Sequence, residues 1–156
     1  MLRKADVSTA PIGPEALAQP RRLQAKMTDA ARAAWVDAAR DILIAGGIAA
    51  LNLRGLAASL GVTTGAFYSV FAGLEDLHEA LRQRWLEQNV TPMIAAMDAA
   101  GDDGFQQYLA ALRLTVLGGG LDPRFDNAIR DWSHSAPRTA EVLAEEGIDA
   151  EVVDLR

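Results

Sequence analysis

Residues 52–71 restrict the possible folds of this chain more than any other part of its sequence. Asn52 is a favourable N-cap, because its side-chain oxygen can accept a free backbone N–H of the first helical turn. Apolar residues then recur at helical spacing until Gly61, which can adopt the left-handed conformation that stops a helix. Thr63 can cap a second short helix, and Ala57 is small enough for the two helices to cross closely. These features predict a helix-turn-helix, whose second helix has the shape to enter a major groove.

Helical patterns flank this motif on both sides. Thr28 or Asp29 can cap a preceding helix, whereas residues 1–27 hold three of the six prolines and no long periodicity, which predicts a mostly disordered arm. A long helix is expected to follow the motif, with a kink or break near residues 89–92 because of Pro92. Asp102 or Asp103, and then Asp122 before Pro123, indicate the starts of two further helices.

No strand pattern is present, so the sequence predicts an all-α fold. The expected parts are an arm (1–27), a three-helix DNA-binding head (28–74) and a helical body (75–156). Half of the 156 residues are hydrophobic, which is enough for a core. No apolar run approaches the ~20 residues of a membrane span, and the N-terminus has no apolar signal region. A soluble cytoplasmic protein without a membrane partner is therefore expected.

The composition argues against several kinds of site. No cysteine is present, which excludes disulfides and thiolate metal sites, and the presence of only two histidines argues against a histidine metal cluster. The abundant carboxylates are scattered, and no nucleophile with a spaced base and no phosphate loop is found. The sequence therefore predicts neither an enzyme nor a metal site nor a cofactor.

The charge is divided unevenly along the chain. Residues 1–84 hold ten Lys and Arg against eight Asp and Glu, a net charge of +2, whereas residues 85–156 hold five against thirteen, a net charge of −8. Phosphate binding is local, so the sign of the head matters more than the total of −6. The small positive charge permits DNA binding but is also compatible with a chance fluctuation.

The residues around the motif resemble the N-terminal domain of the TetR-type (TetR/AcrR) transcriptional repressors. The run GVTTGAFYSVF is much more specific than a bare helix-turn-helix pattern, while the rest of the chain fits the family only as generic helices. The matching positions are Ala39, Leu43, Gly46 or Gly47, Arg54, Leu56, Ala57, Gly61-Val62-Thr63, Gly65-Ala66-Phe67-Tyr68, Phe71 and Glu75-Asp76-Leu77.

The resemblance implies which residues contact operator DNA. Arg54 matches a position that reads base edges or phosphate, and Tyr68 matches a tyrosine whose hydroxyl binds a phosphate. The alternatives are a solvated surface arginine and a structural tyrosine. Small and hydroxyl residues at the exposed start of the second helix allow close approach to DNA. These residues are Thr63, Thr64, Gly65 and Ala66, with Ser69 as a weaker reader; Val62, Phe67 and Phe71 are assigned to the core.

Two features depart from the family pattern. Leu74 stands where the family usually has a phosphate-binding lysine, so binding is expected to be weaker or more salt-sensitive than is usual. The two helices that generally build the family's homodimer cannot be placed in this sequence. The chain is therefore expected to be shortened at its C-terminus, or to form a dimer through other surfaces.

In the family, the body encloses a small-molecule pocket. The resemblance therefore implies an effector, and the character of the candidate residues indicates a largely apolar one. The alternative for each candidate is an ordinary place in the core. The candidates are Trp85, Met93, Met97, Phe105, Tyr108, Phe125 and Trp132, with His134 as a polar handle.

The leading interpretation is a ligand-responsive transcriptional regulator, in particular a repressor, that binds operator DNA as a dimer. The alternative is a helical adaptor or ligand-binding module that has lost operator binding. Leu74 and the sparse positive charge favour this alternative, whereas Arg54, Tyr68 and the intact turn oppose it.

Overall fold

The computed structural model describes residues 14–117 and 120–145, and within them the regular secondary structure is helical, with no strand. This confirms the predicted all-α fold. The elements are α1 (Pro14–Gly46), a 3-10 turn (Ile48–Ala50), α2 (Leu53–Leu60), α3 (Thr64–Phe67), α4 (Leu74–Trp85), a π turn (Leu86–Val90), α5 (Thr91–Ala99), α6 (Gly104–Val116), α7 (Pro123–Ser133) and α8 (Pro137–Glu145).

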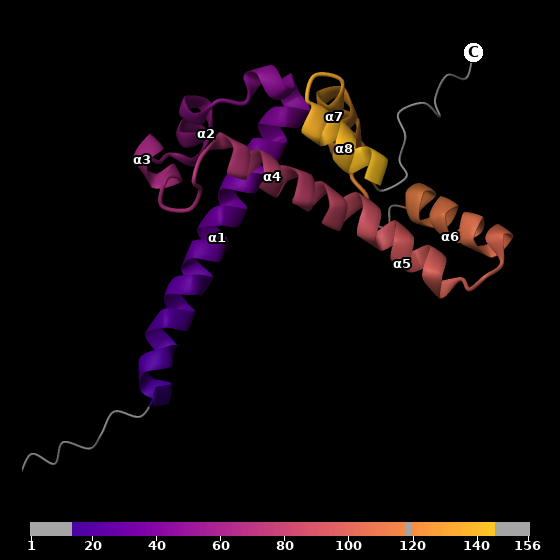
Figure 1. Cartoon of the computed structure of the whole chain (residues 1–156), viewed down its shortest axis with the longest axis horizontal. Helices are drawn as coiled ribbons and strands as arrows, with labels where there is room; N and C mark the ends of the chain where they lie inside the picture. Colours follow the sequence, from indigo (N-terminus) through magenta and orange to yellow (C-terminus); the bar gives the residue numbers. More distant parts are fainter. Residues whose placement is uncertain (1–13, 118–119, 146–156) are drawn as a thin grey trace, which may run out of the picture.

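Helix α4 crosses α1 near the middle of the molecule (Figure 1). The short helices α2 and α3 lie to one side of this crossing, and α7 and α8 lie on the other side, where α7 packs against both α1 and α4. Helices α5 and α6 form a hairpin that extends away from the rest. The crossing of α1 and α4 therefore joins the helix-turn-helix to the remaining helices.

One hydrophobic core runs through the helix-turn-helix, the crossing and α7–α8. Leu56 and Phe67 from the motif, Leu77 and Trp85 from α4, and Phe125 from α7 are fully buried. Full burial of a side chain of this size stabilises the fold by about 1.5–3 kcal/mol. Because the same core includes both ends of α4, a displacement of that helix would disturb the packing of the helix-turn-helix and of α7 and α8.

Helix α1 begins earlier than the sequence pattern predicts. Residues 14–27 were expected to belong to an irregular arm, but they are helical, and the helix continues through Thr28 and Asp29, so neither residue is an N-cap. The Thr28 hydroxyl instead donates to the Gln24 carbonyl one turn earlier, at 3.0 Å. Residues 14–27 are rich in Ala, Leu, Gln, Arg and Lys, which favour a helix even without an apolar stripe. Residues 1–13 of the expected arm lie outside the described residues.

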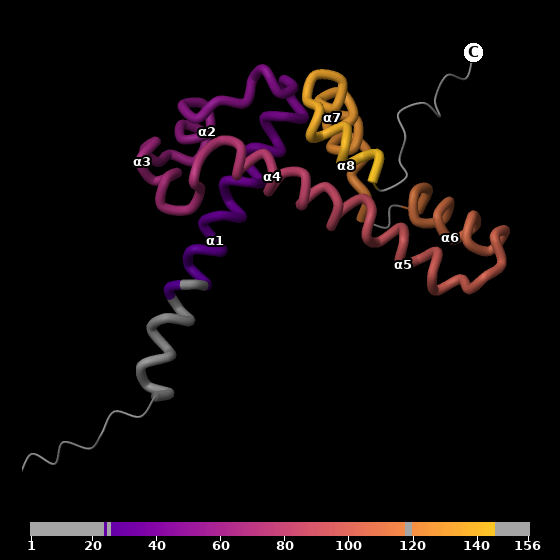
Figure 2. Tube along the Cα trace, in the orientation of Figure 1, coloured from indigo at the N-terminus to yellow at the C-terminus, as the bar shows by residue number. Residues whose placement is uncertain are grey.

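The break expected near residues 89–92 is confirmed as a π turn. The path continues from α4 through this turn into α5 without reversing (Figure 2). Pro92 has no N–H for an i→i−4 hydrogen bond, and its ring crowds the preceding turn, so the wider turn accommodates it. Asn89 and Val90 are buried within the turn.

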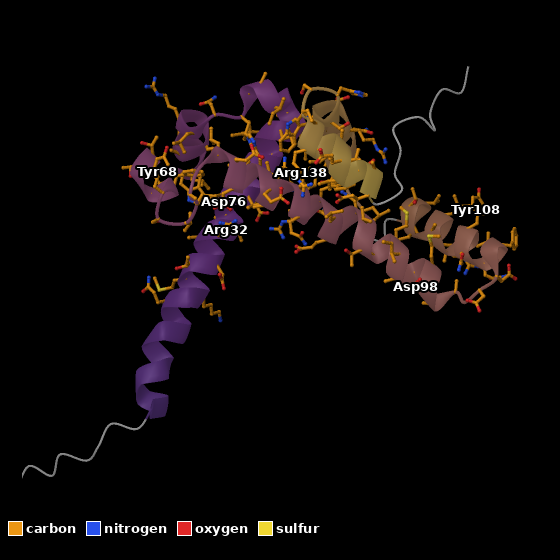
Figure 3. All side chains as sticks on the ribbon, viewed as in Figure 1. Arg32, Tyr68, Asp76, Asp98, Tyr108 and Arg138 are labelled. Carbon is orange, nitrogen blue, oxygen red and sulfur yellow. The ribbon has the colours of Figure 1, made fainter. Side chains whose placement is uncertain are left out.

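Apolar residues recur at helical spacing along α6, but this stripe faces outward in the monomer. Phe105 is 64% exposed and Tyr108 is 61% exposed, and Leu112, Val116 and Leu117 are exposed with them. The side chain of Tyr108 points away from the neighbouring helices (Figure 3).

Among the described residues, no helix is long and apolar enough to cross a membrane.

Candidate nucleic-acid interface

The turn between α2 and α3 is built as the sequence predicts. The Asn52 side chain caps α2 by accepting a hydrogen bond from the Gly55 N–H at 2.9 Å. Gly61 ends the helix at φ 65°, in the left-handed region that only glycine enters without steric cost. The Val62 N–H then donates to the Ala57 carbonyl at 3.0 Å, which closes the helix end. The direction of α3 is thus fixed by backbone geometry.

The residues predicted to contact DNA lie on the surface around α3. Thr63, Thr64 and Gly65 are exposed, Ala66 is partly buried, and Ser69 is exposed. Thr63 occupies the N-cap position, although its hydroxyl makes no capping hydrogen bond. Tyr68 is 63% exposed and projects outward at the edge of the molecule (Figure 3).

The core beneath α3 is aromatic. Phe67 is fully buried, and its ring meets Trp35 of α1 edge to face at 5.3 Å and stacks on Phe71 at 5.1 Å. Such pairs add about 0.5–1.5 kcal/mol beyond the area they bury. Val62, which was assigned to the core, is instead 44% exposed, because the closing turn directs it to the surface. A short helix of four residues is therefore held in place by its buried side.

Arg54 is exposed in the first turn of α2, and no ion pair of the described residues involves it. Several other arginines are already paired, among them Arg32 with Asp76, Arg84 with Asp37 and Arg130 with Asp126. The guanidinium of Arg54 thus remains available for a bidentate contact to a guanine or a phosphate.

The sequence did not reveal the brace between Arg32 and Asp76, which holds the turn after α3 in place. Arg32 of α1 donates to the Val70 carbonyl at 2.9 Å and to Asp76 Oδ1 at 2.7 Å, with its guanidinium 4.1 Å from the centre of the Phe71 ring. Asp76 also accepts from the Ala72 N–H at 3.0 Å. The hydrogen bond from Arg32, followed by that from Ala72, holds the Asp76 pKa below its ordinary value. Arg32 and Asp76 lie 44 positions apart, so no local pattern could reveal their contact.

A second arginine fastens α4 to α8. Arg82 is 2% exposed, and its guanidinium contacts Glu75 and Glu79, each at 2.8 Å, and donates to the buried Thr139 hydroxyl at 3.3 Å. The hydrogen bond from Arg82 is the largest influence on Glu75 and lowers the pKa of that carboxyl. The sequence identified Glu75 only as a position that matches the family pattern.

The body residues proposed for an effector pocket are found in three different environments. Met93 and Met97 line a cavity of about 490 Å³ between α5 and the start of α7. Trp85, Phe125 and Trp132 are buried in the core. Phe105 and Tyr108 lie on the exposed face of α6, and His134 is exposed after α7. Within the described ranges, no group of three or more metal-ligating side chains is present.

Comparison with known proteins places the head in a family. Residues 36–81 match the family model described as bacterial regulatory proteins, tetR family. The matched segment extends from α1 into α4 and so contains the complete helix-turn-helix with parts of the helices that support it. The match confirms the resemblance seen in the sequence. Neither a curated protein nor a solved structure matched the chain.

Proposed function

Because the chain belongs to the tetR family of bacterial regulatory proteins through residues 36–81, we propose that this DNA-binding regulator is a ligand-responsive repressor. It acts in the cytoplasm, occupies operator DNA as a homodimer, and leaves the DNA when a small, largely apolar effector binds its body. The observation that carries the proposal is Arg54, which is exposed and forms no ion pair with the part of the chain that the structure describes, beside the exposed small and hydroxyl-bearing residues of α3.

Arg54 supplies the specificity in this proposal. A bidentate arginine contact to guanine discriminates against other bases by about 1–3 kcal/mol. The Tyr68 hydroxyl and the N–H groups at the start of α3 bind phosphate and set the register of the head. Thr63 and Thr64 offer hydroxyls to phosphate and methyl groups to thymine.

A homodimer compensates for the few cations of one head. Leu74, which begins α4, is 38% exposed and apolar, so it supplies no charge to phosphate. Two heads on one two-fold axis double the phosphate contacts and read two half-sites about 34–36 Å apart, or a multiple of this distance. The exposed apolar face of α6 (Phe105, Tyr108, Leu112 and Val116) is the surface that we assign to the second copy, since a patch of this kind marks an interaction site.

Fluorescence anisotropy on the DNA flanking the protein's own gene tests operator binding, with excess random duplex as competitor. Wild-type protein is expected to bind despite the competitor. Arg54→Ala should weaken specific binding by about five- to 150-fold, and Tyr68→Phe should weaken binding to specific and random duplex alike. Arg113→Ala removes an exposed arginine from α6 and is the matched control, with unchanged binding expected.

The alternative function is tested by the same titration. Wild-type binding no tighter than to random duplex at low salt would replace the regulator with a helical adaptor, in which Leu74 contributes to a protein-binding surface. A reporter gene placed behind the flanking DNA tests the direction of regulation. Deletion of the regulator should raise expression, and a fall would identify an activator.

A further inference from the structure

The cavity between α5 and α7 has an apolar wall. Its volume is about 490 Å³, within the range of small-molecule sites. A wall of this kind suits an aliphatic chain, because each methylene group that leaves water for it is stabilised. The side chains of the wall come from the π turn, α5 and the residues around the start of α7. They are Val90, Met93, Ile94, Met97, Leu121 and Pro123.

One arginine of this cavity has unused hydrogen-bond donors. Arg130 and Asp126 are the charged side chains among the described residues that line the cavity, and their ion pair joins Arg130 Nε to Asp126 Oδ2 at 2.8 Å. Within the described part of the chain, neither terminal nitrogen of Arg130 takes part in a hydrogen bond or an ion pair. Because a guanidinium has five N–H donors and only the one on Nε is used, the N–H groups of both terminal nitrogens remain for a ligand.

The carboxylate of this pair, by contrast, is engaged through both oxygens. Asp126 Oδ1 accepts from the Trp85 indole N–H at 2.9 Å, and Oδ2 accepts from Arg130. The cavity therefore favours a ligand that accepts hydrogen bonds over one that donates them. The Arg130 side chain is 33% exposed, so water reaches it and weakens the repulsion between Asp126 and a second carboxylate on the same guanidinium.

We propose that the effector is an aliphatic monocarboxylate whose two oxygens accept hydrogen bonds from the terminal nitrogens of Arg130. The inference rests on the effector response proposed above and names the chemical class of the ligand and its anchoring residue. The planar guanidinium matches the geometry of a carboxylate, and such charge-assisted hydrogen bonds are about twice as strong as neutral ones. The aliphatic chain lies against Met93 and Met97, away from water.

The same ion pair connects the cavity to the helix that supports the head. Asp126 joins Arg130 to Trp85, which is fully buried at the end of α4. A ligand carboxylate on Arg130 competes with Asp126 for the guanidinium, and a change at Asp126 alters its hydrogen bond with Trp85. Binding at Arg130 therefore acts on α4, whose other end packs with the helix-turn-helix in the same core.

Isothermal titration calorimetry of the whole chain, without DNA, tests the anchor. The probe is octanoate, compared with 1-octanol, which lacks the charge, and with octylammonium, which reverses it. Octanoate is expected to bind at one site per chain and at least tenfold more tightly than the other two, since a hydrogen bond to a charged group changes affinity roughly ten- to 150-fold. Hexanoate should bind about fifteenfold more weakly than octanoate, roughly fourfold for each methylene group removed.

Arginine variants separate the anchor from a general effect of charge. Arg130→Gln removes the guanidinium, so octanoate affinity should fall at least tenfold while 1-octanol affinity stays the same. Arg124→Gln makes the same change at an exposed arginine of α7 outside the cavity and should bind octanoate as wild type does. If Arg130→Gln does not fold, Met97→Trp fills the cavity from its apolar wall and should abolish binding of both octanoate and 1-octanol.

Equal affinities of the wild-type protein for octanoate and 1-octanol, or undiminished octanoate binding by Arg130→Gln or Met97→Trp, would overturn the assignment. So would the absence of any octanoate binding. Operator DNA is added in a separate titration, where octanoate should weaken DNA binding by wild type but not by Arg130→Gln. Octanoate binding with unchanged operator affinity would refute the link through Trp85, while absence of operator binding altogether would refute the proposed function without affecting the calorimetric result.

Discussion

The substitution Gly65→Ala should stabilise the head slightly while it weakens the contact of the head with DNA. Gly65 lies in α3, and an added Cβ would meet only the Thr63 Oγ1 atom, at 3.7 Å, which is an ordinary contact. Alanine is favoured over glycine in a helix by about 0.5–1 kcal/mol, so the variant should be slightly more stable than wild type. On the outer side, the new methyl group would occupy the space through which the α3 backbone reaches a phosphate in the proposed complex.

The expected loss of binding follows from one contact. A hydrogen bond to a charged group is worth about 1.5–3 kcal/mol, so removal of one N–H contact to phosphate should weaken operator binding roughly ten- to 150-fold. Thermal unfolding should show a melting temperature about 1–4 °C above that of wild type. Operator affinity should therefore fall while the melting temperature rises.

Gly104→Ala is the matched control for this experiment. Gly104 begins α6, and its added Cβ would meet no atom within 4 Å. The control should gain stability without losing operator affinity. If Gly65→Ala binds operator as tightly as wild type, the backbone of α3 does not approach DNA closely, and the assignment of the exposed α3 residues as the contact surface is wrong.

Three further perturbations test the charges and the association of the chain. Leu74→Lys should tighten operator binding and steepen the salt dependence by about 0.9 in the slope of log affinity against log salt, and an unchanged slope would place residue 74 away from phosphate. In the folded state the Asp76 pKa is lowered, principally by the hydrogen bond from Arg32. The ionised carboxylate therefore stabilises the folded state above about pH 4, and this stabilisation is lost as the pH falls through the lowered pKa. Asp76→Asn should therefore flatten the acid side of the urea-unfolding profile, and an unaltered profile would show that the brace adds no stability. Leu112→Glu places a charge on the α6 face and should shift sedimentation from dimer to monomer; a persistent dimer would assign association to another surface.

The features that were predicted correctly from the sequence depend on residues that lie close together along the chain. The caps at Asn52 and Asp122, the left-handed stop at Gly61 and the break before Pro92 are each decided within a turn of chain. The family resemblance belongs to the same class, because its most specific run is contiguous. These local rules were sufficient for the helical fold and for the helix-turn-helix.

The errors arose where a residue's surroundings are set by distant parts of the chain. Helical spacing identified the stripe on α6 but could not show whether another helix covers it, and it is exposed. The same spacing could not separate Met97, which lines a cavity, from Trp85, which is enclosed in the core. Asn89 was noted in the sequence only as the start of an expected break, since its bond to the backbone N–H of Asp122 joins residues 33 positions apart.

The two acidic residues that begin α4 show how local and distant interactions combine. Both suit the positive end of the helix dipole, which explains their place in the sequence. In the folded chain, however, Asp76 binds Arg32 of α1, whereas Glu75 binds Arg82, which reaches Thr139 of α8. The first turn of α4 is thus tied to both the head and the body. Consider a ligand that binds more tightly when α4 lies in one of two alternative placements. Such a ligand would also shift the head, because the first turn of α4 is bonded to the head and the helix cannot move in the body alone.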